Sequence, residues 1–380
     1  MNHAVEPIPD ALPTIRRGVC CVMFVFDLAF AIDLDHVERI LKVDAQREIL
    51  RPSRKSPSYF EYTPAPLRVS IPAQPIRVAG FSTQPSVEVL VFDFGAALVS
   101  FRIPLTGSIR DLVQLSAELP DQAQLASEAR EHADAFCRRI AEASRRPGLT
   151  PHVEDYFAYQ IEEAEFEGSD CAPSRLVELA PGMLAQILRG EVSPMSADQI
   201  EDALRFRLSY GPDDAAIIDW NAALLLDREA EDIAPVLEYA NVELLEMRVL
   251  DDRLDESLDE AYRASQSAPT GLRRIFPASG GGARRIAQLQ VDSAILFEGV
   301  NNALKLTGDQ YLARLYRLAA QRFHLPDRDA TIERKLQTLQ SISSTMHDDD
   351  SARRIETLEW IIIILIAFEI VMGLYDRLIA

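Results

Sequence analysis

The chain has 380 residues, 48% of them hydrophobic, and its acidic residues outnumber its basic ones to give a formal net charge of −20. This length accommodates about two or three domains, and the composition is typical of a folded protein rather than a disordered one. The negative charge argues against direct nucleic-acid binding, because such binding depends on lysine and arginine side chains that neutralise phosphates.

The first 85 residues are predicted to form an N-terminal extension with a strand, a helix and a proline-rich connector. The apolar run from Gly18 to Ala31 favours a buried strand, and residues 34–43 favour a short helix capped by Asp33. Six prolines between Pro52 and Pro75 favour an extended loop with an edge strand near residues 67–71.

Targeting signals and cysteine usage indicate the compartment. Arg16 and Arg17 precede an apolar run and so have the outline of a signal peptide, but Asp27 and Asp33 break that pattern. The four cysteines contain no CxxC pair, which is typical of a reducing compartment. A bacterial cytoplasmic setting for the N-terminal part is therefore expected.

An internal repeat marks residues 86–226 as one α+β domain. Residues 91–99 and 217–225 share the pattern of two apolar residues, Asp, an aromatic residue, Gly or Asn, two alanines and two apolar residues. This pattern predicts two related β-hairpins, because Gly and Asn accept the positive φ of tight turns. Asp93 and Asp219 occupy the same place in the two copies. A turn-forming role is the favoured interpretation of both, and a general base is the alternative.

The rest of this domain alternates helices and strands. Helices are predicted over Ile109–Leu119 and Gln122–Ser144, and a strand over Val153–Ile161. Residues Arg205–Tyr210 are expected to pair with Ala215–Trp220.

Residues 227–350 are predicted to form a helical hairpin of coiled-coil type. Apolar residues from Ile233 to Ala261 recur at spacings of three and four, which predicts a helix of roughly 30 residues with an acidic outer face. A glycine-containing link over residues 264–282 follows. Helices are expected over 283–304, 309–322 and 327–346, the last with near-heptad spacing.

Motifs for catalysis, metals and cofactors are weak. The run Gly280–Gly282 lacks the pattern of a phosphate-binding loop, and the six histidines show no HExxH spacing. His347 and the three aspartates after it are metal-ligand types, but consecutive residues point in different directions. We therefore expect no catalytic residue, no metal site and no cofactor.

The C-terminal segment, residues 354–377, is predicted to be a single transmembrane helix. Leu358 to Leu374 would span roughly 25 Å as a helix, near the lower limit for crossing a hydrocarbon core. The predicted anchor residues are Trp360, Ile361, Ile362, Ile363, Ile364, Leu365, Ile366, Phe368, Glu369 and Tyr375. Arginines just before the segment predict a cytoplasmic soluble part and a location in the bacterial inner membrane. A buried helix of a soluble core is the alternative.

Glu369 is an ionisable residue inside this apolar segment. Such groups are rare in membrane helices and usually face another helix or water. Association with a second helix and a tolerated defect are the two interpretations.

The ending from Leu358 to Glu369, with Leu-Glu-Trp, an aliphatic run and Glu, resembles the "required for meiotic nuclear division" family, a domain of unknown function. The hairpin at Asp219 and the helix beginning at Asn241 are also similar to that family. The family-like positions are Asp219, Trp220, Asn221, Asn241, Leu245, Glu246, Arg248, Asp251, Asp252, Leu358 and Glu359. The resemblance implies a bacterial member of a family whose mitochondrial members are inner-membrane proteins linked to translation.

The family-like helix that contains Glu246 and Arg248 allows two interpretations. Its charged residues form simple intrahelical pairs, or they form an interaction surface.

The predicted fold class is α+β: an N-terminal mixed α/β region with two related β-hairpins, then a long-helix, coiled-coil-like region that ends in one transmembrane helix. The expected function is a membrane-tethered, self-associating scaffold without enzymatic activity. Its expected partners are the lipid bilayer, a second copy of the chain and a cytoplasmic protein. The alternatives are an enzyme with a nucleotide-dependent site at the hairpins, and a translation-associated membrane factor, against which the net charge argues.

Overall fold

A computed structural model describes residues 12–41, 45–47, 60–62, 64–228, 233–266, 291, 304–306, 310–342, 344–345, 359, 362–363 and 365–366. The chain forms two compact units. The first unit comprises Met1–Val249 and Gly299–Arg328, and the second comprises Leu250–Glu298 and Asp329–Ala380. The division into residues 1–85, 86–226, 227–350 and 354–377 that the sequence suggests stays a prediction.

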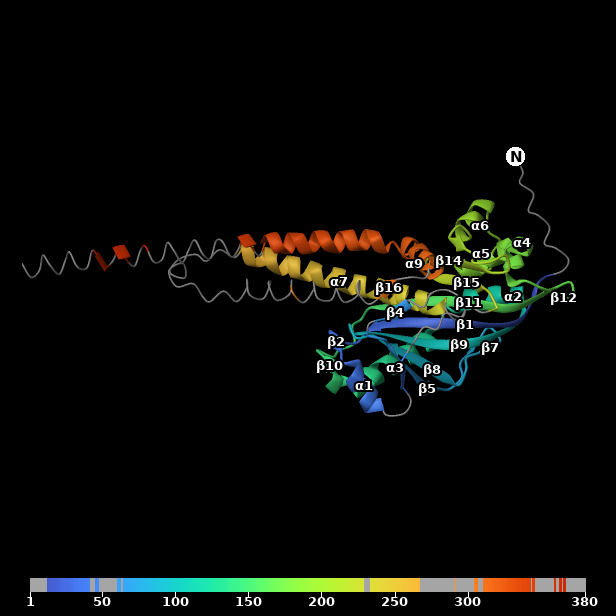
Figure 1. Cartoon of the computed structure of the whole chain (residues 1–380), viewed down its shortest axis with the longest axis horizontal. Coiled ribbons are helices and arrows are strands. Elements are labelled where there is room, and N and C mark those ends of the chain that lie inside the picture. Colours follow the sequence, from blue (N-terminus) through green and yellow to red (C-terminus); the bar gives the residue numbers. More distant parts are fainter. Residues whose placement is uncertain are drawn as a thin grey trace, which may run out of the picture. The chain divides into compact units, whose positions relative to one another are not determined.

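A mixed sheet forms the centre of the first unit (Figure 1). Its strands follow the order β13 (Arg207–Leu208), β14 (Ala215–Ile218), β15 (Ala222–Leu226), β11 (Val153–Phe166), β1 (Thr14–Asp27), β9 (Ala96–Ser108), β8 (Ser86–Val91), β5 (Leu67–Pro72) and β3 (Ala45–Arg47). Strand β12 (Ser169–Cys171) pairs with β11 outside this order. The neighbouring pairs are antiparallel except β11 and β15, which run parallel.

Short pairs lie outside the main sheet. They are β2 (Ala31–Ile32) with β10 (Ser144–Arg145), β4 (Phe60–Tyr62) with β16 (Leu304–Leu306), and β6 (Arg77–Val78) with β7 (Phe81–Ser82). The helices of the first unit include α1 (Leu34–Leu41), α2 (Ile109–Glu118), α3 (Ala123–Arg139), α4 (Leu176–Leu179), α5 (Pro181–Arg189), α6 (Ala197–Ala203) and α9 (Gln310–Arg322). Two 3₁₀ turns, Ala141–Ala143 and Pro173–Arg175, join these elements.

Both faces of the sheet are buried. On β1, Val22 and Phe24 belong to one core cluster with residues of α2, α3 and α5, while Met23, which points to the opposite face, is also fully buried. Successive residues of a strand point to opposite faces of the sheet. When both faces are buried, both sets of residues are therefore apolar, instead of only every second residue. This explains the continuous apolar run in the sequence of β1.

The sequence-predicted hairpins pair β8 with β9 and β14 with β15. The first turn requires glycine, because Gly95 has φ +111° and a Cβ there would lie 1.8 Å from the carbonyl oxygen of Ala29. The second turn differs, because Asn221 does not adopt a positive φ. Instead the Asn221 carbonyl accepts a hydrogen bond from the amide of Phe157 at 3.1 Å, which ties the turn to β11.

Helix α7 (Ala234–Gln266) confirms the predicted long helix. Its residues from Leu250 onward belong to the second unit, together with residues 329–342 of a later helix that includes Lys335. The Lys335 ammonium contacts the carboxylates of Asp251 and Asp255 at 2.6 Å each. Burial lowers the pKa of Lys335, but the hydrogen bonds that its ammonium donates to these two aspartates, together with their negative charges, outweigh that effect and leave the pKa raised. These ion pairs join the two helices of the hairpin.

The predicted fold class is wrong in its last element. Among the described residues, no helix is long and apolar enough to cross a membrane. This finding overturns the transmembrane helix over residues 354–377, the membrane and tail-anchored interpretations, and the assignment to the bacterial inner membrane. What the structure has is a mixed α+β fold built on a large sheet. Apolar length and interfacial aromatic residues do not by themselves separate a membrane span from a buried helix or a helix–helix contact.

Candidate functional site

Asp219 lies in the turn between β14 and β15. Its backbone amide donates to the carbonyl of Ala222 at 2.8 Å, which closes the turn. Its Oδ1 accepts a hydrogen bond from the amide of Trp220 at 2.8 Å. The side chain therefore caps its own turn, as aspartates often do. The Asp219 residue is 0% exposed although its neighbour Trp220 is 56% exposed.

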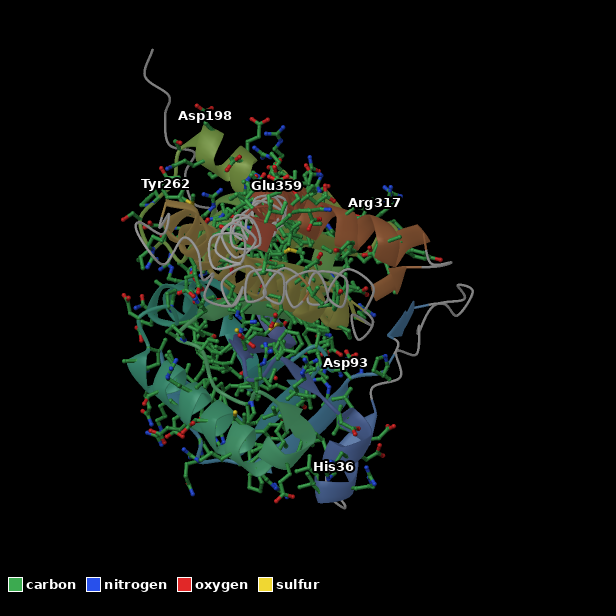
Figure 2. The ribbon with its side chains drawn as sticks, turned by 90° about the vertical axis from the view of Figure 1, so that its left-hand side faces the viewer. His36, Asp93, Asp198, Tyr262, Arg317 and Glu359 are labelled. Carbon is green, nitrogen blue, oxygen red and sulfur yellow. The ribbon has the colours of Figure 1, made fainter. Side chains whose placement is uncertain are left out.

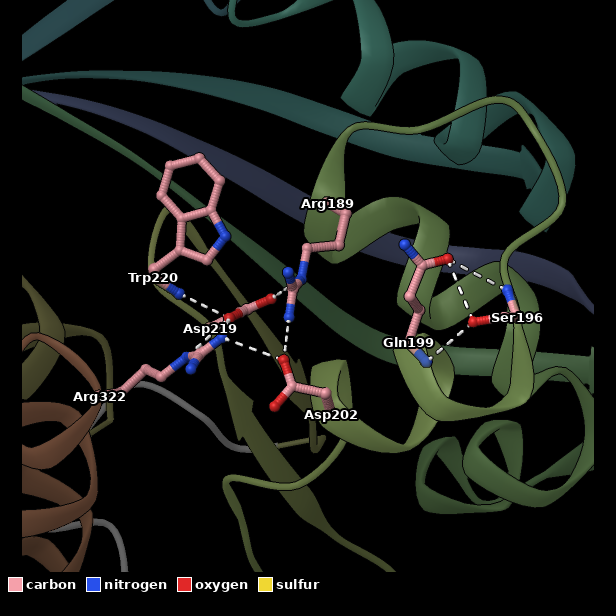
Figure 3. Close-up of polar contacts among 7 residues, drawn as sticks. All are labelled: Arg189, Ser196, Gln199, Asp202, Asp219, Trp220 and Arg322. Atoms are coloured by element: carbon pink, nitrogen blue, oxygen red, sulfur yellow. Dashed lines mark hydrogen bonds and ion pairs between the residues drawn. The ribbon is translucent and has the colours of Figure 1, made fainter.

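Two arginines converge on this buried carboxylate (Figure 3). Arg322 donates from Nε to Oδ1 at 2.7 Å and also contacts this oxygen through Nη2. Arg189 forms an ion pair with Oδ2 through its Nε. Side-chain exposure is 15% for Arg322 and 24% for Arg189. A buried carboxylate is tolerated when such partners compensate its charge.

Asp202 contacts both arginines on the side that faces solvent. Its Oδ2 accepts a hydrogen bond from Arg189 Nη2 at 2.6 Å and lies 3.8 Å from Arg322 Nη2. The Asp202 side chain is 48% exposed. We call Arg189, Asp202, Asp219 and Arg322 the arginine–aspartate cluster. Its two positive and two negative charges balance.

Local helix signals place these side chains. Arg189 is the last residue of α5, which ends at Gly190 in the left-handed conformation, and Arg322 is the last residue of α9. Cations are favourable at helix C-termini because of the helix dipole. Helix α6, which carries Asp202, starts with a capping box between Ser196 and Gln199 (Figure 3).

Aromatic residues surround the cluster. The Arg322 guanidinium lies 5.1 Å from the centre of the Phe206 ring, within the range of a cation–π interaction. The Tyr156 hydroxyl donates to the Asp219 carbonyl at 3.2 Å, and burial raises the pKa of Tyr156 well above its ordinary value. The Tyr156 ring also contacts Phe323 edge-on. These contacts connect the hairpin, β11 and the end of α9.

The chemistry of the cluster is that of a structural connection. Oδ1 of Asp219 accepts from one amide and one guanidinium, and Oδ2 faces a second guanidinium. A general base needs a free lone pair within reach of a substrate proton. Oδ1 is occupied by these donors and Oδ2 lies buried in an ion pair with Arg189, away from solvent, so the geometry favours the turn interpretation over the general base.

Asp93, which is labelled in Figure 2, is the equivalent residue of the first hairpin and is only partly buried. Its carbonyl accepts from the amide of Ile32 at 2.7 Å. Burial raises the pKa of the Asp93 carboxyl, and hydrogen bonds from the amides of Asp93 and Phe94 partly oppose this shift. The two copies of the repeat therefore share a turn but not a charge environment.

Most of the family-like residues of α7 that lie in the first unit are buried. Leu245 is fully buried, Glu246 is 4% exposed, and Asn241 Nδ2 donates to the carbonyl of Leu237 at 2.8 Å. Arg248 forms an ion pair with Glu154 of β11, which is a contact to the sheet rather than an intrahelical pair. This part of α7 therefore packs against the sheet instead of presenting an open surface.

More polar contacts link α7 to its neighbours in the same unit. Glu238 accepts from Arg68 Nη2 of β5 at 2.7 Å, and Glu243 accepts from the Tyr316 hydroxyl of α9 at 2.5 Å. In the second unit Asp251 contacts Lys335, as described above, and Asp252 is exposed.

The described residues favour neither a reactive cysteine nor a metal site. The four cysteines are free, and burial raises the pKa of Cys21 to about 12, which keeps its thiol protonated at neutral pH. Within the described ranges, no group of histidine, cysteine, aspartate or glutamate residues is arranged to hold a metal ion.

The C-terminal residues that the sequence singles out are described only in part. Ile362, Ile363, Leu365 and Ile366 are helical and 53%, 53%, 60% and 52% exposed. Glu359 is also exposed. The remaining positions, Leu358, Trp360, Ile361, Ile364, Phe368, Glu369 and Tyr375, lie outside the described residues.

Sequence reasoning missed Arg189, Asp202 and Arg322. The available signal was an arginine in the last turn of an amphipathic helix. Such an arginine is predicted to interact favourably with the helix dipole, but this signal does not identify the acidic residue that it contacts.

Two comparisons with known proteins match the region of the sheet. The family model described as "Uncharacterized protein MJ0711, N-terminal domain" matches residues 17–232. The "Uncharacterized protein MJ0711" of Methanocaldococcus jannaschii is 23% identical over 204 residues, which is 53% of this chain and 62% of the relative. The match thus spans less than two thirds of the relative. No solved structure matches.

These matches overturn the resemblance to the "required for meiotic nuclear division" family, because the family model that fits is a different one. The short aliphatic ending that carried the resemblance is a low-complexity pattern and lies beyond the matched residues. Arg189, Asp202 and Asp219 lie within the match, whereas Arg322 lies outside it.

Proposed function

The chain belongs to the family of the MJ0711 N-terminal domain, and we propose that it is a non-enzymatic interaction protein that self-associates through an exposed aliphatic helix face. That face consists of Ile362, Ile363, Leu365 and Ile366, and it is named the aliphatic face below. The proposal covers the whole chain, including the part that the family match leaves out.

The observation that carries the proposal is the exposure of the aliphatic face. All four side chains are more than half exposed, at 52–60%. Covering apolar surface contributes about 25 cal/mol per Å², and contiguous exposed apolar side chains usually mark an interaction site. Isolated exposed residues such as Val192, at 56%, are ordinary and need no partner.

The spacing of these residues suits a helix–helix contact. Ile362 and Leu365 are three residues apart and Ile362 and Ile366 are four apart, which places them on one side of a helix. A second copy of the chain presents an identical face, and symmetric dimers that bury the same patch on both subunits are the commonest oligomers. A second copy is therefore the proposed occupant.

The arginine–aspartate cluster supports the non-enzymatic part of the proposal. Its central carboxylate is buried, accepts hydrogen bonds at Oδ1 and forms an ion pair with Arg189 at Oδ2, which is the arrangement expected of a connection between secondary-structure elements. The second candidate is an enzyme with a site at the hairpins, which the equivalent positions of Asp93 and Asp219 in the two copies of the repeat suggest. Asp93→Asn distinguishes the two candidates, because a catalytic aspartate is essential for the cellular role and a turn aspartate is not.

Sedimentation velocity of the full chain over a range of concentrations tests the self-association. The wild type is expected to form an oligomer whose population rises with concentration. Ile362→Glu combined with Ile366→Glu places two charges in the aliphatic face and is expected to shift the protein to monomer. Val192→Glu is the matched control, because it adds a charge at a similarly exposed aliphatic residue. A monomeric wild type, or equal oligomerisation of all variants, contradicts the proposal.

A further inference from the structure

A cavity of about 230 Å³ opens beside Trp220 in the first unit. Its apolar floor is formed by Phe157 and Tyr159 of β11 and by Ile187 and Leu188 of α5, which are all at most 3% exposed. Trp220 lines its edge and is 56% exposed. The cavity therefore combines a buried apolar base with an accessible aromatic ring, which is the usual composition of a small-ligand site.

Two helix C-termini meet at this cavity. Ser116 and Ala117 belong to the last turn of α2, and Ile187 to Arg189 belong to the last turn of α5. Each C-terminus carries the equivalent of roughly half a negative charge, because its last carbonyl groups lack helical partners. The cavity thus has a negative electrostatic environment before any charged side chain is considered.

Pro120 strengthens this effect at α2. The carbonyl of Ser116 would normally accept from the amide four residues later, but that residue is Pro120, which has no N–H group. Both residues line the cavity. The Ser116 oxygen faces Gly190, where a Cβ would lie only 3.1 Å away. Glycine at this position therefore leaves space next to the carbonyl.

The charged side chains around the cavity sum to a negative charge. Arg189 lines the cavity, but its guanidinium contacts the carboxylates of Asp219 and Asp202. The arginine–aspartate cluster is balanced overall, with two charges of each sign. Asp121, which is exposed and lines the cavity, then adds one uncompensated negative charge.

We propose that this cavity binds an organic cation, the ammonium or guanidinium group of a small amine or of a basic side chain. The aromatic face of Trp220 attracts such a cation, the two helix C-termini and Asp121 stabilise its charge, and the apolar floor accommodates its alkyl part. An anion is disfavoured by the same features. This binding site is independent of the aliphatic face and of self-association.

Tryptophan fluorescence measures binding directly. The chain contains two tryptophans, so Trp360→Phe leaves Trp220 as the sole reporter. In this background, n-butylammonium chloride is expected to change the fluorescence in a saturable manner. n-Butanol, which has the same alkyl chain without the charge, is expected to bind about two- to fivefold more weakly from the loss of the cation–π interaction alone. Sodium butyrate and sodium chloride at equal ionic strength are expected to give no saturable change.

A variant at the cavity edge tests the site. Asp121→Asn in the same background is expected to weaken butylammonium binding about two- to fivefold, which corresponds to an exposed charge pair. Asp198→Asn is the matched control, because Asp198 is an exposed aspartate at the start of α6 that does not line the cavity. N-acetyl-lysine amide distinguishes a basic protein side chain from a free small amine as the ligand. Tighter binding than butylammonium indicates a basic side chain, and weaker binding indicates a free amine.

Two results overturn the proposal. One is the absence of saturable quenching by both cations while circular dichroism shows the fold intact. The other is equal binding of butylammonium and butanol, because the cavity would then recognise only the alkyl chain. Equal affinities of the Asp121→Asn and Asp198→Asn variants would remove Asp121 from the site.

Discussion

Arg322 and Asp219 are 103 residues apart in the sequence and form a largely buried ion pair, in which the partly exposed Arg322 donates from Nε to Oδ1 of the fully buried Asp219 at 2.7 Å. The aspartate belongs to the family-matched region, and the arginine ends α9, beyond that region. This pair therefore attaches a later helix to the hairpin of the sheet domain.

Removing the carboxylate charge is expected to destabilise the first unit. Asp219→Asn leaves two largely buried guanidinium groups without their main counter-charge, and breaking a buried pair in this way typically costs about 3–5 kcal/mol. Urea denaturation followed by circular dichroism measures the loss. Asp93→Asn is the control at the equivalent turn position, and an equally large loss there would contradict the special role of the cluster.

Arg322→Lys is expected to weaken the attachment of α9 without abolishing it. Lysine keeps the positive charge but loses the two-nitrogen contact to Oδ1 and most of the stacking on Phe206. A loss of about 1–3 kcal/mol follows, with faster hydrogen exchange in α9 than in β1. Wild-type exchange rates in α9 of the lysine variant would show that the guanidinium geometry is not needed.

Asp93 is expected to make stability depend on pH in a specific direction. Burial raises its folded-state pKa above the ordinary value of 3.8, so the folded state binds this proton more tightly than the unfolded state. Stability from this group is therefore highest below pH 3.8 and is lost as pH rises through the raised pKa. Asp93→Asn should remove this loss. Denaturation curves of wild type and variant should converge at low pH and diverge toward neutral pH, with the variant more stable there.

Cys21 is expected to react slowly with iodoacetamide. Its pKa is raised from 9.0 to about 12, mainly by burial, so its thiolate fraction at a given pH is about 1000-fold lower than that of an ordinary thiol. Mass spectrometry of peptides after timed alkylation measures the rate, and the urea-unfolded protein is the reference. Alkylation in the folded protein at the unfolded rate would contradict this environment.

Local sequence patterns predicted much of the secondary structure. The helix over residues 34–43 corresponds to α1, with Asp33 Oδ1 accepting from the amide of His36 at 3.0 Å. The pairing of residues 205–210 with 215–220 corresponds to β13 and β14. These elements were predictable because side-chain periodicity and capping residues act within a few positions of the chain.

The sequence alone could not assign the environment of the C-terminal aliphatic run. Apolar length is common to a membrane span, a buried core helix and an oligomer interface, so hydropathy does not separate them. The described side chains of that run are exposed on a helix, and no described helix reaches the length and apolarity of a membrane span. The finding against the predicted membrane span therefore comes from the structure of the described residues and not from hydropathy.

The sequence by itself determined the alternation of strands, the long amphipathic helix and the turn position of Asp219. Tertiary structure decided which charges meet: Arg189 and Arg322 reach Asp219 from the ends of two helices that are distant in the sequence. Periodicity reports which face of an element is buried, because it depends on residues a few positions apart. Pairing between distant charged residues has no such local signature, since it depends on how whole elements pack around the sheet.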